Sequence, residues 1–106
     1  MYQGYLIAQT ETGERSRIPV GNSLVLGRAE DAGYVLDDTA ASRLHLEVYN
    51  KGDEFFVRDL DSTNGTYVNG ERIRERRLKK GDEIQVGQTI LQFRTQELEA
   101  PEVKTA

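Results

Sequence analysis

Two Asn-Gly pairs, Asn64-Gly65 and Asn69-Gly70, stand close together in the second half of this chain. Asn-Gly is the strongest short-range signal for a β-hairpin, because both residues tolerate the positive φ angles of tight two-residue turns. The second pair is explained by a hairpin between residues 66–68 and 72–73. The first pair lies in a loop crowded with short polar side chains, which a turn alone does not need. The stretch therefore predicts a β protein with a polar loop beside one hairpin.

The rest of the chain alternates short apolar segments with turn residues. In one segment a period of two places Leu44, Leu46 and Val48 on the same face. No window sustains a helical period, and turns about 8–12 residues apart are typical of a sandwich or barrel. We therefore expect an all-β fold with strands at residues 4–9, 24–27, 44–50, 55–60, 66–68, 83–86 and 89–94.

Length and composition exclude several classes of protein. A chain of 106 residues is expected to form one domain, at residues 1–95, with residues 96–106 as an acidic tail or linker. Without cysteine and with a single histidine, neither a disulfide framework nor a metal site is expected. No apolar run or leader suggests a membrane or secretion, so we expect a cytoplasmic protein. The net charge of −4 argues against nucleic-acid binding, so any anion site must be local.

The charged residues outside the polar loop have plainer explanations. The one basic run, at residues 72–80, is either a docking patch or a solvated edge and loop. The acidic whole favours the solvated edge, where charge also discourages pairing between sheets. The carboxylate pairs Glu30-Asp31 and Asp37-Asp38 have no apolar neighbours that would raise a pKa, so they do not suggest acid–base catalysis.

Arginine and serine side chains precede the polar loop and suit a phosphate. Arg28 follows Gly27 at the end of an apolar strand, and its planar fork of donors matches phosphate oxygens. Ser42 offers a hydroxyl and a backbone N–H, which can donate to one oxygen together, and Arg43 stands beside it. The exposed ends of strands and turns explain the same residues without a ligand.

The polar loop supplies side chains that can hold a peptide. The Asn64 amide carries donors and an acceptor, so it can pair with a peptide backbone in two places. Alternatively, Asn64 only supplies a positive φ before Gly65, and the Thr63 hydroxyl only closes the loop. His45 alternates with leucines and has no nucleophile and acid in a plausible order around it. We therefore expect its ring nitrogens to tie two loops together.

Three motifs, in this order and at these separations, resemble the forkhead-associated (FHA) domain over roughly residues 4–95: Gly27-Arg28, Ser42-Arg43-Leu44-His45, and the polar loop with its hairpin turn at residues 62–70. The resemblance implies an FHA-type β-sandwich of about eleven strands in two sheets, with the ligand loops at one end. It also implies a phosphothreonine-peptide site. The implied phosphate-binding residues are Arg28, Ser42 and Arg43, and the implied peptide-backbone contacts are Thr63 and Asn64. The residues implied to shape the site are Gly27, His45, Ser62, Gly65, and Asn69 with Gly70 in a bracing turn.

The resulting hypothesis is a phosphothreonine-dependent binding module in Ser/Thr kinase signalling, without catalysis or cofactor. Its partner would be a threonine-phosphorylated protein, or a phosphosite in its own parent chain, rather than nucleic acid or membrane. Two alternatives remain: a phosphate-independent assembly module, which would not need Arg28, Ser42 and Asn64, and the regulatory domain of a larger enzyme or regulator. Ala40-Ala41 departs from the family, which often has a larger residue there, and leaves one wall of the groove less defined.

Overall fold

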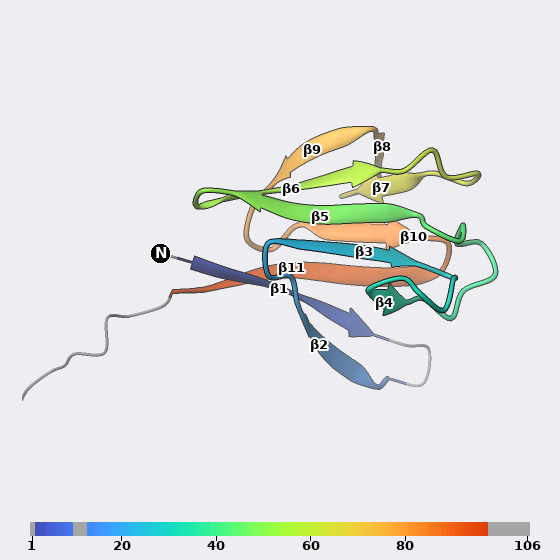
Figure 1. Ribbon diagram of the computed structural model, residues 1–106, viewed down its shortest axis with the longest axis horizontal. Helices are drawn as coiled ribbons and strands as arrows, with labels where there is room; N and C mark the ends of the chain where they lie inside the picture. Colours follow the sequence, from blue (N-terminus) through green and yellow to red (C-terminus); the bar gives the residue numbers. More distant parts are fainter. Residues whose placement is uncertain (1, 10–12, 98–106) are drawn as a thin grey trace, which may run out of the picture.

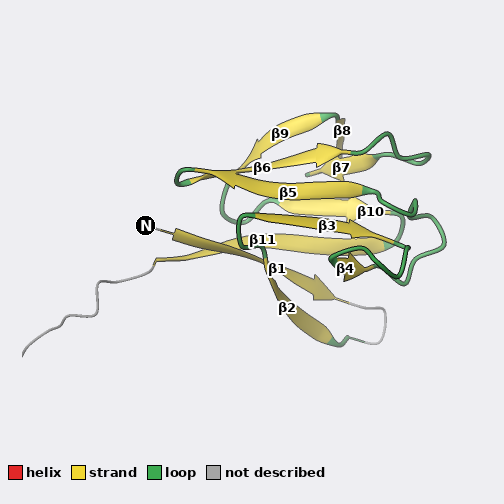
Figure 2. Ribbon diagram, viewed as in Figure 1, coloured by secondary structure: helices red, strands yellow, loops and turns green. Residues whose placement is uncertain are grey.

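The fold is a sandwich of two β-sheets (Figure 1; Figure 2). The computed structural model describes residues 2–9 and 13–97, which contain eleven strands and no helix. This confirms the expected all-β sandwich. The strands are β1 (Tyr2–Gln9), β2 (Arg15–Pro19), β3 (Ser23–Gly27), β4 (Tyr34–Val35), β5 (Leu46–Lys51), β6 (Glu54–Asp59), β7 (Thr66–Val68), β8 (Glu71–Ile73), β9 (Glu75–Leu78), β10 (Glu83–Val86) and β11 (Thr89–Glu97).

The strands divide into a six-stranded and a five-stranded sheet. The first has the order β2-β1-β11-β10-β7-β8, and the second has the order β4-β3-β5-β6-β9. The β3–β4 pair is parallel, whereas the other registered pairs are antiparallel. Both sheets alternate buried and exposed side chains, as expected for strands with one face against a core.

The core lies between the sheets and is made of aliphatic side chains around two phenylalanines. The rings of Phe55 and Phe93 pack with their centroids 5.3 Å apart, one from each sheet. Leu6, Leu26 and Val57 are fully buried around them. Each such side chain contributes about 1.5–3 kcal/mol through its removal from water. The loops therefore stand on a rigid frame.

Three strands were not predicted, and each of them is an edge strand of its sheet. β2 and β4 each form the outer strand of a sheet, as does β9 on the opposite side. Edge strands bury few residues: Ile18 is the buried residue of β2, and Leu78 is that of β9. The basic run supplies β8 and β9, the two edges on that side, which agrees with its interpretation as a charged edge.

The prediction for Leu44 was wrong. β5 begins at Leu46, and the Leu44 side chain is 48% exposed, whereas His45 is fully buried. Residues 42–45 form a turn whose backbone carbonyls accept hydrogen bonds from the loops after β3 and β6. The alternation of β5 therefore cannot be extended through them. Strand β11 extends past the expected domain boundary at residue 95, because Gln96 still belongs to it and pairs with Gln3. Residues 98–106 lie outside the described residues.

The hairpin at Asn69-Gly70 is confirmed. Both residues have positive φ angles, 51° and 87°, and Val68 pairs with Glu71 across the turn. The Asn69 amide donates to Asp82 Oδ1 at 3.0 Å, and its oxygen accepts from the Glu83 N–H at 3.0 Å. Its side chain therefore braces the β9–β10 turn rather than the polar loop that precedes β7.

Candidate functional site

Three loops meet at one end of the sandwich, where β3 and β6 end and β5 and β7 begin (Figure 1). Backbone hydrogen bonds join the loop after β3 to the loop before β5: Arg28 N–H donates to Ser42 O at 2.9 Å, and Ala29 N–H donates to Arg43 O at 3.0 Å. The loop after β6 is joined to the same place, because Leu60 N–H donates to His45 O at 2.8 Å. The predicted site residues from three separate motifs are thereby brought together.

Gly27 allows these loops to approach. A Cβ built on Gly27 would lie 2.0 Å from Arg43 O and 2.9 Å from Leu44 Cα. Both are backbone atoms, which cannot move aside as the end of a side chain could. Any other residue at this position would push the 42–44 backbone away, and Arg28 would no longer lie against Ser42.

Two arginines of the site carry charges that the described residues do not neutralise. Arg28 Nε donates to Ala41 O at 3.0 Å, which fixes the guanidinium while its terminal nitrogens stay available. Arg43 is exposed. Neither arginine has a carboxylate within salt-bridge distance in residues 2–9 and 13–97. Guanidinium groups without anionic partners are well suited to bind an anion, and that of Arg28 is also held in place.

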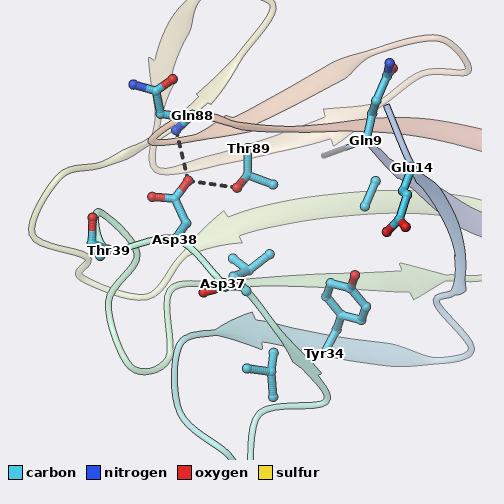
Figure 3. Close-up of a pocket in the computed structure, with 11 residues that line it drawn as sticks. Gln9, Glu14, Tyr34, Asp37, Asp38, Thr39, Gln88 and Thr89 are labelled. Atoms are coloured by element: carbon cyan, nitrogen blue, oxygen red, sulfur yellow. Dashed lines mark hydrogen bonds between the residues drawn. The ribbon is translucent and has the colours of Figure 1, made fainter. Parts of the chain in front are cut away.

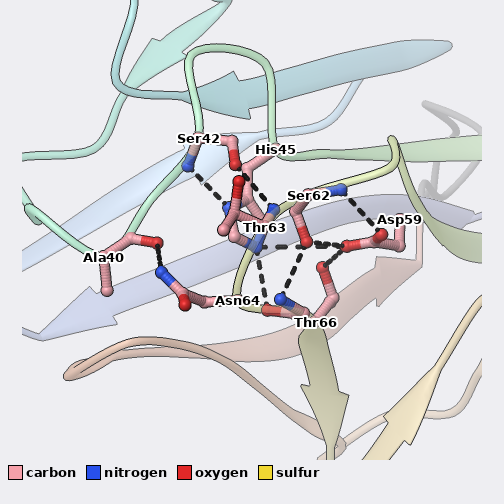
Figure 4. Close-up of polar contacts among 9 residues, drawn as sticks. Ala40, Ser42, His45, Asp59, Ser62, Thr63, Asn64 and Thr66 are labelled. Atoms are coloured by element: carbon pink, nitrogen blue, oxygen red, sulfur yellow. Dashed lines mark hydrogen bonds and ion pairs between the residues drawn. The ribbon is translucent and has the colours of Figure 1, made fainter.

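Ser42 joins the loop before β5 to the polar loop before β7, with its backbone N–H as a donor and its Oγ as an acceptor (Figure 4). Its backbone N–H donates to His45 Nδ1 at 2.9 Å, and its Oγ accepts from the Thr63 N–H at 3.0 Å. This corrects one prediction: the N–H expected to donate to a phosphate is already engaged. The Ser42 hydroxyl donates no hydrogen bond in the described part of the chain, so Ser42 can offer an anion its hydroxyl alone.

His45 ties two loops together, as the sequence predicted. Since Nδ1 accepts from the Ser42 N–H, the ring proton is on Nε2, which donates to Gly65 O at 2.9 Å (Figure 4). The ring is fully buried, and Asp59 Oδ1 lies 4.0 Å from Nε2. The imidazole therefore acts as a strut between residues 42 and 65 and has no exposed nitrogen for chemistry.

Asp59 organises the polar loop and was not singled out from the sequence. Its oxygens accept from the Ser62 N–H at 3.0 Å, the Ser62 hydroxyl at 2.5 Å and the Thr66 hydroxyl at 2.6 Å. Ser62 Oγ in turn accepts from the Gly65 N–H at 2.9 Å, and Gly65 has a φ of 91°. The expected loop-shaping roles of Ser62 and Gly65 agree with these contacts. The signal in the sequence is an Asp followed three residues later by Ser, which is typical of a side-chain-closed turn.

Burial raises the pKa of Asp59, but the hydrogen bonds from Ser62 and Thr66 outweigh it and lower the pKa below its ordinary value of 3.8. A lowered pKa means that the folded state prefers the carboxylate. Its contribution to the free energy of unfolding is therefore present above that ordinary value and is lost as the pH falls through the lowered one.

Asn64 and Thr63 lie on the exposed side of the polar loop. Asn64 Nδ2 donates to Ala40 O at 2.9 Å, which bridges to the loop before β5 (Figure 4). Asn64 does not have a positive φ, so the alternative in which it only serves the turn is wrong. The Thr63 hydroxyl makes no hydrogen bond within the described residues, whereas its backbone N–H closes the loop. Both side chains keep polar atoms for a ligand.

A second aspartate, Asp38, joins the loop before β5 to the turn between β10 and β11. It accepts from the Ala40 N–H and the Gln88 N–H, both at 2.9 Å, and from the Thr89 hydroxyl at 2.7 Å (Figure 3). Burial raises its pKa, but these bonds lower it more, so the pKa is lowered and acid–base catalysis is not indicated. Asp38 also lines a pocket of about 550 Å³, together with Val35 and Thr39.

The described residues contain no group of three or more side chains arranged to hold a metal ion. They also contain no helix that is long and apolar enough to cross a membrane.

Comparison with known proteins identifies the family. The family model of the FHA domain matches residues 24–87. Two curated relatives from Mycolicibacterium smegmatis are similar: glycogen accumulation regulator GarA is 46% identical over 69 residues, 65% of this chain and 44% of GarA, and FhaB is 38% identical over 81 residues, 74% of this chain and 52% of FhaB. The chain thus spans about half the length of these relatives.

A solved structure gives the same result. It belongs to a structural and functional analysis of phosphothreonine-dependent FHA domain interactions, and it matches 91% of this chain and 99% of its own with a TM-score of 0.79 at 34% identity. The family match covers more than half of the chain, and the two-sheet fold agrees with it. The chain belongs to the FHA domain family.

Proposed function

We propose that the loop end of this domain binds a threonine-phosphorylated peptide, as a non-catalytic module in Ser/Thr kinase signalling. The observation that supports this most is the pair of arginines, Arg28 and Arg43, which lack a carboxylate partner among the described residues and belong to the two loops whose backbones are joined at Ser42 and Arg43. Adding a phosphate to threonine supplies about −1.5 to −2 charge and three acceptor oxygens, which these groups would pair.

The peptide backbone would be held by the polar loop. The Asn64 oxygen accepts no hydrogen bond within the described residues, and its amide has a second hydrogen beyond the bond to Ala40. One acceptor and one donor can pair with a peptide N–H and C=O, as a neighbouring strand would. The Thr63 hydroxyl adds a further partner at the same edge. The phosphate and the peptide main chain are then bound by different residues, so tight binding requires both parts of the ligand.

The family comparisons support this proposal. The related structure concerns phosphothreonine-dependent interactions, and GarA is named as a regulator. By analogy the partner is a threonine-phosphorylated protein in the cytoplasm, modified by a Ser/Thr kinase, or a phosphosite in the parent chain. Because the chain spans about half of its relatives, a role as the regulatory domain of a larger protein is the second candidate.

Affinity for a phosphothreonine peptide is expected to fall steadily between about pH 6.5 and 5, because the second phosphate pKa is about 6 and the site prefers the dianion. Above pH 7 the affinity should be constant. A Glu analogue of the peptide, with one charge and planar geometry, should bind weakly at every pH. Calorimetric titration of the phosphorylated, Glu-substituted and unmodified peptides at each pH measures this.

A thermal melt at each pH serves as the control, since it separates protonation of the ligand from a change in the protein. Asp59 and Asp38 have lowered pKa values, so they remain ionised throughout this range and do not contribute to the decline. Equal, pH-independent binding of all three peptides would instead favour an assembly module that does not need phosphate.

Replacing Arg76, Arg77 and Lys79 together with Gln is expected to change phosphopeptide affinity little at physiological salt. Arg76 pairs with Glu71 at 2.5 Å and Arg77 pairs with Glu54 at 3.6 Å, so part of their charge is already neutralised. Exposed charges more than about 8 Å from a ligand are largely screened at that salt. A tenfold or greater loss of affinity in titrations would make the basic run a docking surface after all.

A further inference from the structure

The outer faces of the two sheets differ in how many of their charged side chains have a partner of opposite charge. On the five-stranded sheet most charged side chains have a polar partner on the same face: Arg58 lies 2.7 Å from Glu47, Arg77 lies 3.6 Å from Glu54, and the Tyr49 hydroxyl donates to Glu75. Lys51 instead lies over the Phe56 ring. Most positive and negative groups are thus matched within the face. Such a surface has little unpaired charge that could attract a charged partner protein.

The outer face of the six-stranded sheet has no such matching. Leu6, Ala8, Leu91 and Phe93 point into the core, so the residues between them on β1 and β11 point outward. The arginines on this face are Arg15, Arg17, Arg72 and Arg94, and none of them has a carboxylate within salt-bridge distance in the described ranges.

The hydrogen-bond partners of these arginines are neutral. Arg17 Nη2 donates to Gln96 Oε1 at 2.6 Å, and Arg94 Nη2 donates to Gln92 Oε1 at 2.8 Å. The glutamines hold the guanidinium groups in place without cancelling their charge. The carboxylate on the outward side of β10 is Glu83, which lies near Gln92 at 3.3 Å and not near an arginine. This face is therefore positive in a chain whose net charge is −4.

Apolar and aromatic side chains lie among these arginines. The strand registers place Ile7 between Arg17 and Gln92, and Tyr5 beside Arg94. Ile90 is 39% exposed, one of the few large apolar side chains with that much exposure among the described residues. Arginine and tyrosine around an apolar centre is the composition that protein interfaces favour.

We propose that this basic sheet face, made by Tyr5, Ile7, Arg15, Arg17, Ile90 and Arg94, docks a carboxylate-rich surface of a partner protein. Guanidinium groups held by glutamines can form two parallel hydrogen bonds to each carboxylate, while Ile7 and Ile90 supply apolar contact. The face lies on a sheet surface, whereas the phosphothreonine site lies on the loops at one end, so both can be occupied together. The proposal goes beyond the phosphopeptide function and does not depend on it.

The same arginines suit nucleic acid less well. The Arg17 guanidinium lies 3.8 Å from the centroid of the Tyr5 ring and covers it, so a base cannot stack there. Tight binding to a phosphate backbone typically uses roughly 6–10 phosphate contacts, more than this face offers, and the net charge of −4 repels a polyanion. A partner with a few well-placed carboxylates matches the face better.

The test uses a synthetic Glu-Asp-Leu repeat peptide as the probe and isotope-labelled protein whose loop site is saturated with a phosphothreonine peptide. NMR titration is expected to shift the backbone signals of Ile7, Arg17 and Ile90. The Arg17→Gln and Arg94→Gln double variant should bind the probe about tenfold more weakly, because both charge-assisted contacts are lost. The matched control, Arg58→Gln with Arg77→Gln on the other sheet, should bind it like the parent.

Phosphopeptide affinity should be unchanged in both double variants, which separates this proposal from the function of the loops. Shifts confined to residues 28–43 and 62–65, or no shifts at all, would overturn it. So would equal loss of probe binding in the two double variants, or tighter binding of a single-stranded RNA oligonucleotide or of phosphatidylserine vesicles than of the acidic peptide. Thermal melts establish that each variant is folded, and Arg15→Gln alone repeats the test if the first pair is not.

Discussion

Arg28→Ala is expected to weaken binding of a phosphothreonine peptide at least roughly thirtyfold while leaving the fold intact. Removing one partner of a hydrogen-bonded charge pair costs about 2–5 kcal/mol, and 1.4 kcal/mol corresponds to a tenfold change. The stability should change little, because the Arg28 side chain is exposed and makes a single hydrogen bond to the described residues, from Nε to Ala41 O. The loss would therefore come from the phosphate contact itself.

Calorimetric titration and thermal melts of the variant measure these two effects. Arg28→Lys keeps the charge but not the planar fork, so its affinity should lie between those of the parent and the alanine variant. Arg77→Ala is the control, since Arg77, on the edge strand β9, is also an exposed arginine but pairs with Glu54 of β6. Unchanged affinity in a folded Arg28→Ala protein would disprove the phosphate role.

The sequence predicted the inner strands of both sheets because their alternation is strong. β7 and β10 have the predicted bounds, and β3, β6 and β11 differ from the prediction only at their ends. The edge strands β2, β4 and β9 were missed because a strand with one neighbour and one or no buried side chain has no clear hydrophobic period. The charged composition that protects an edge also hides it from pattern analysis.

The sequence could predict which residues the candidate site brings together, but not the hydrogen-bond network that joins them. Arg28, Ser42 and Asn64 stand out in the sequence because a turn alone does not require their polar side chains. The contact between Asp38 and Thr89 joins residues 51 positions apart and leaves no local pattern. The prediction for the Ser42 N–H was wrong for a related reason: residues 42–45 turn, so the His45 ring points back to Ser42 rather than across a strand.

His45→Ala is expected to lower the melting temperature by more than about 10 °C. The change leaves the Ser42 N–H and the Gly65 C=O without their partners, and an unsatisfied buried group costs about 1–3 kcal/mol. In a domain of this size each kcal/mol lowers the melting temperature by roughly 4–8 °C. His45→Asn keeps an acceptor near Ser42 but loses the donor toward Gly65, so its melting temperature should be intermediate.

Asn64→Ala is expected to give the opposite result in the same assays, a loss of binding with little change in melting temperature. Asn64 is exposed, and within the part of the chain that the structure describes its side chain makes one hydrogen bond, to Ala40 O, so the variant should melt close to the parent. It should nevertheless lose most phosphopeptide binding, because its amide is the group proposed to hold the peptide backbone. If His45→Ala melted like the parent and lost all binding, His45 would contact the ligand. The two variants therefore distinguish the strut beneath the loops from the surface that binds the peptide.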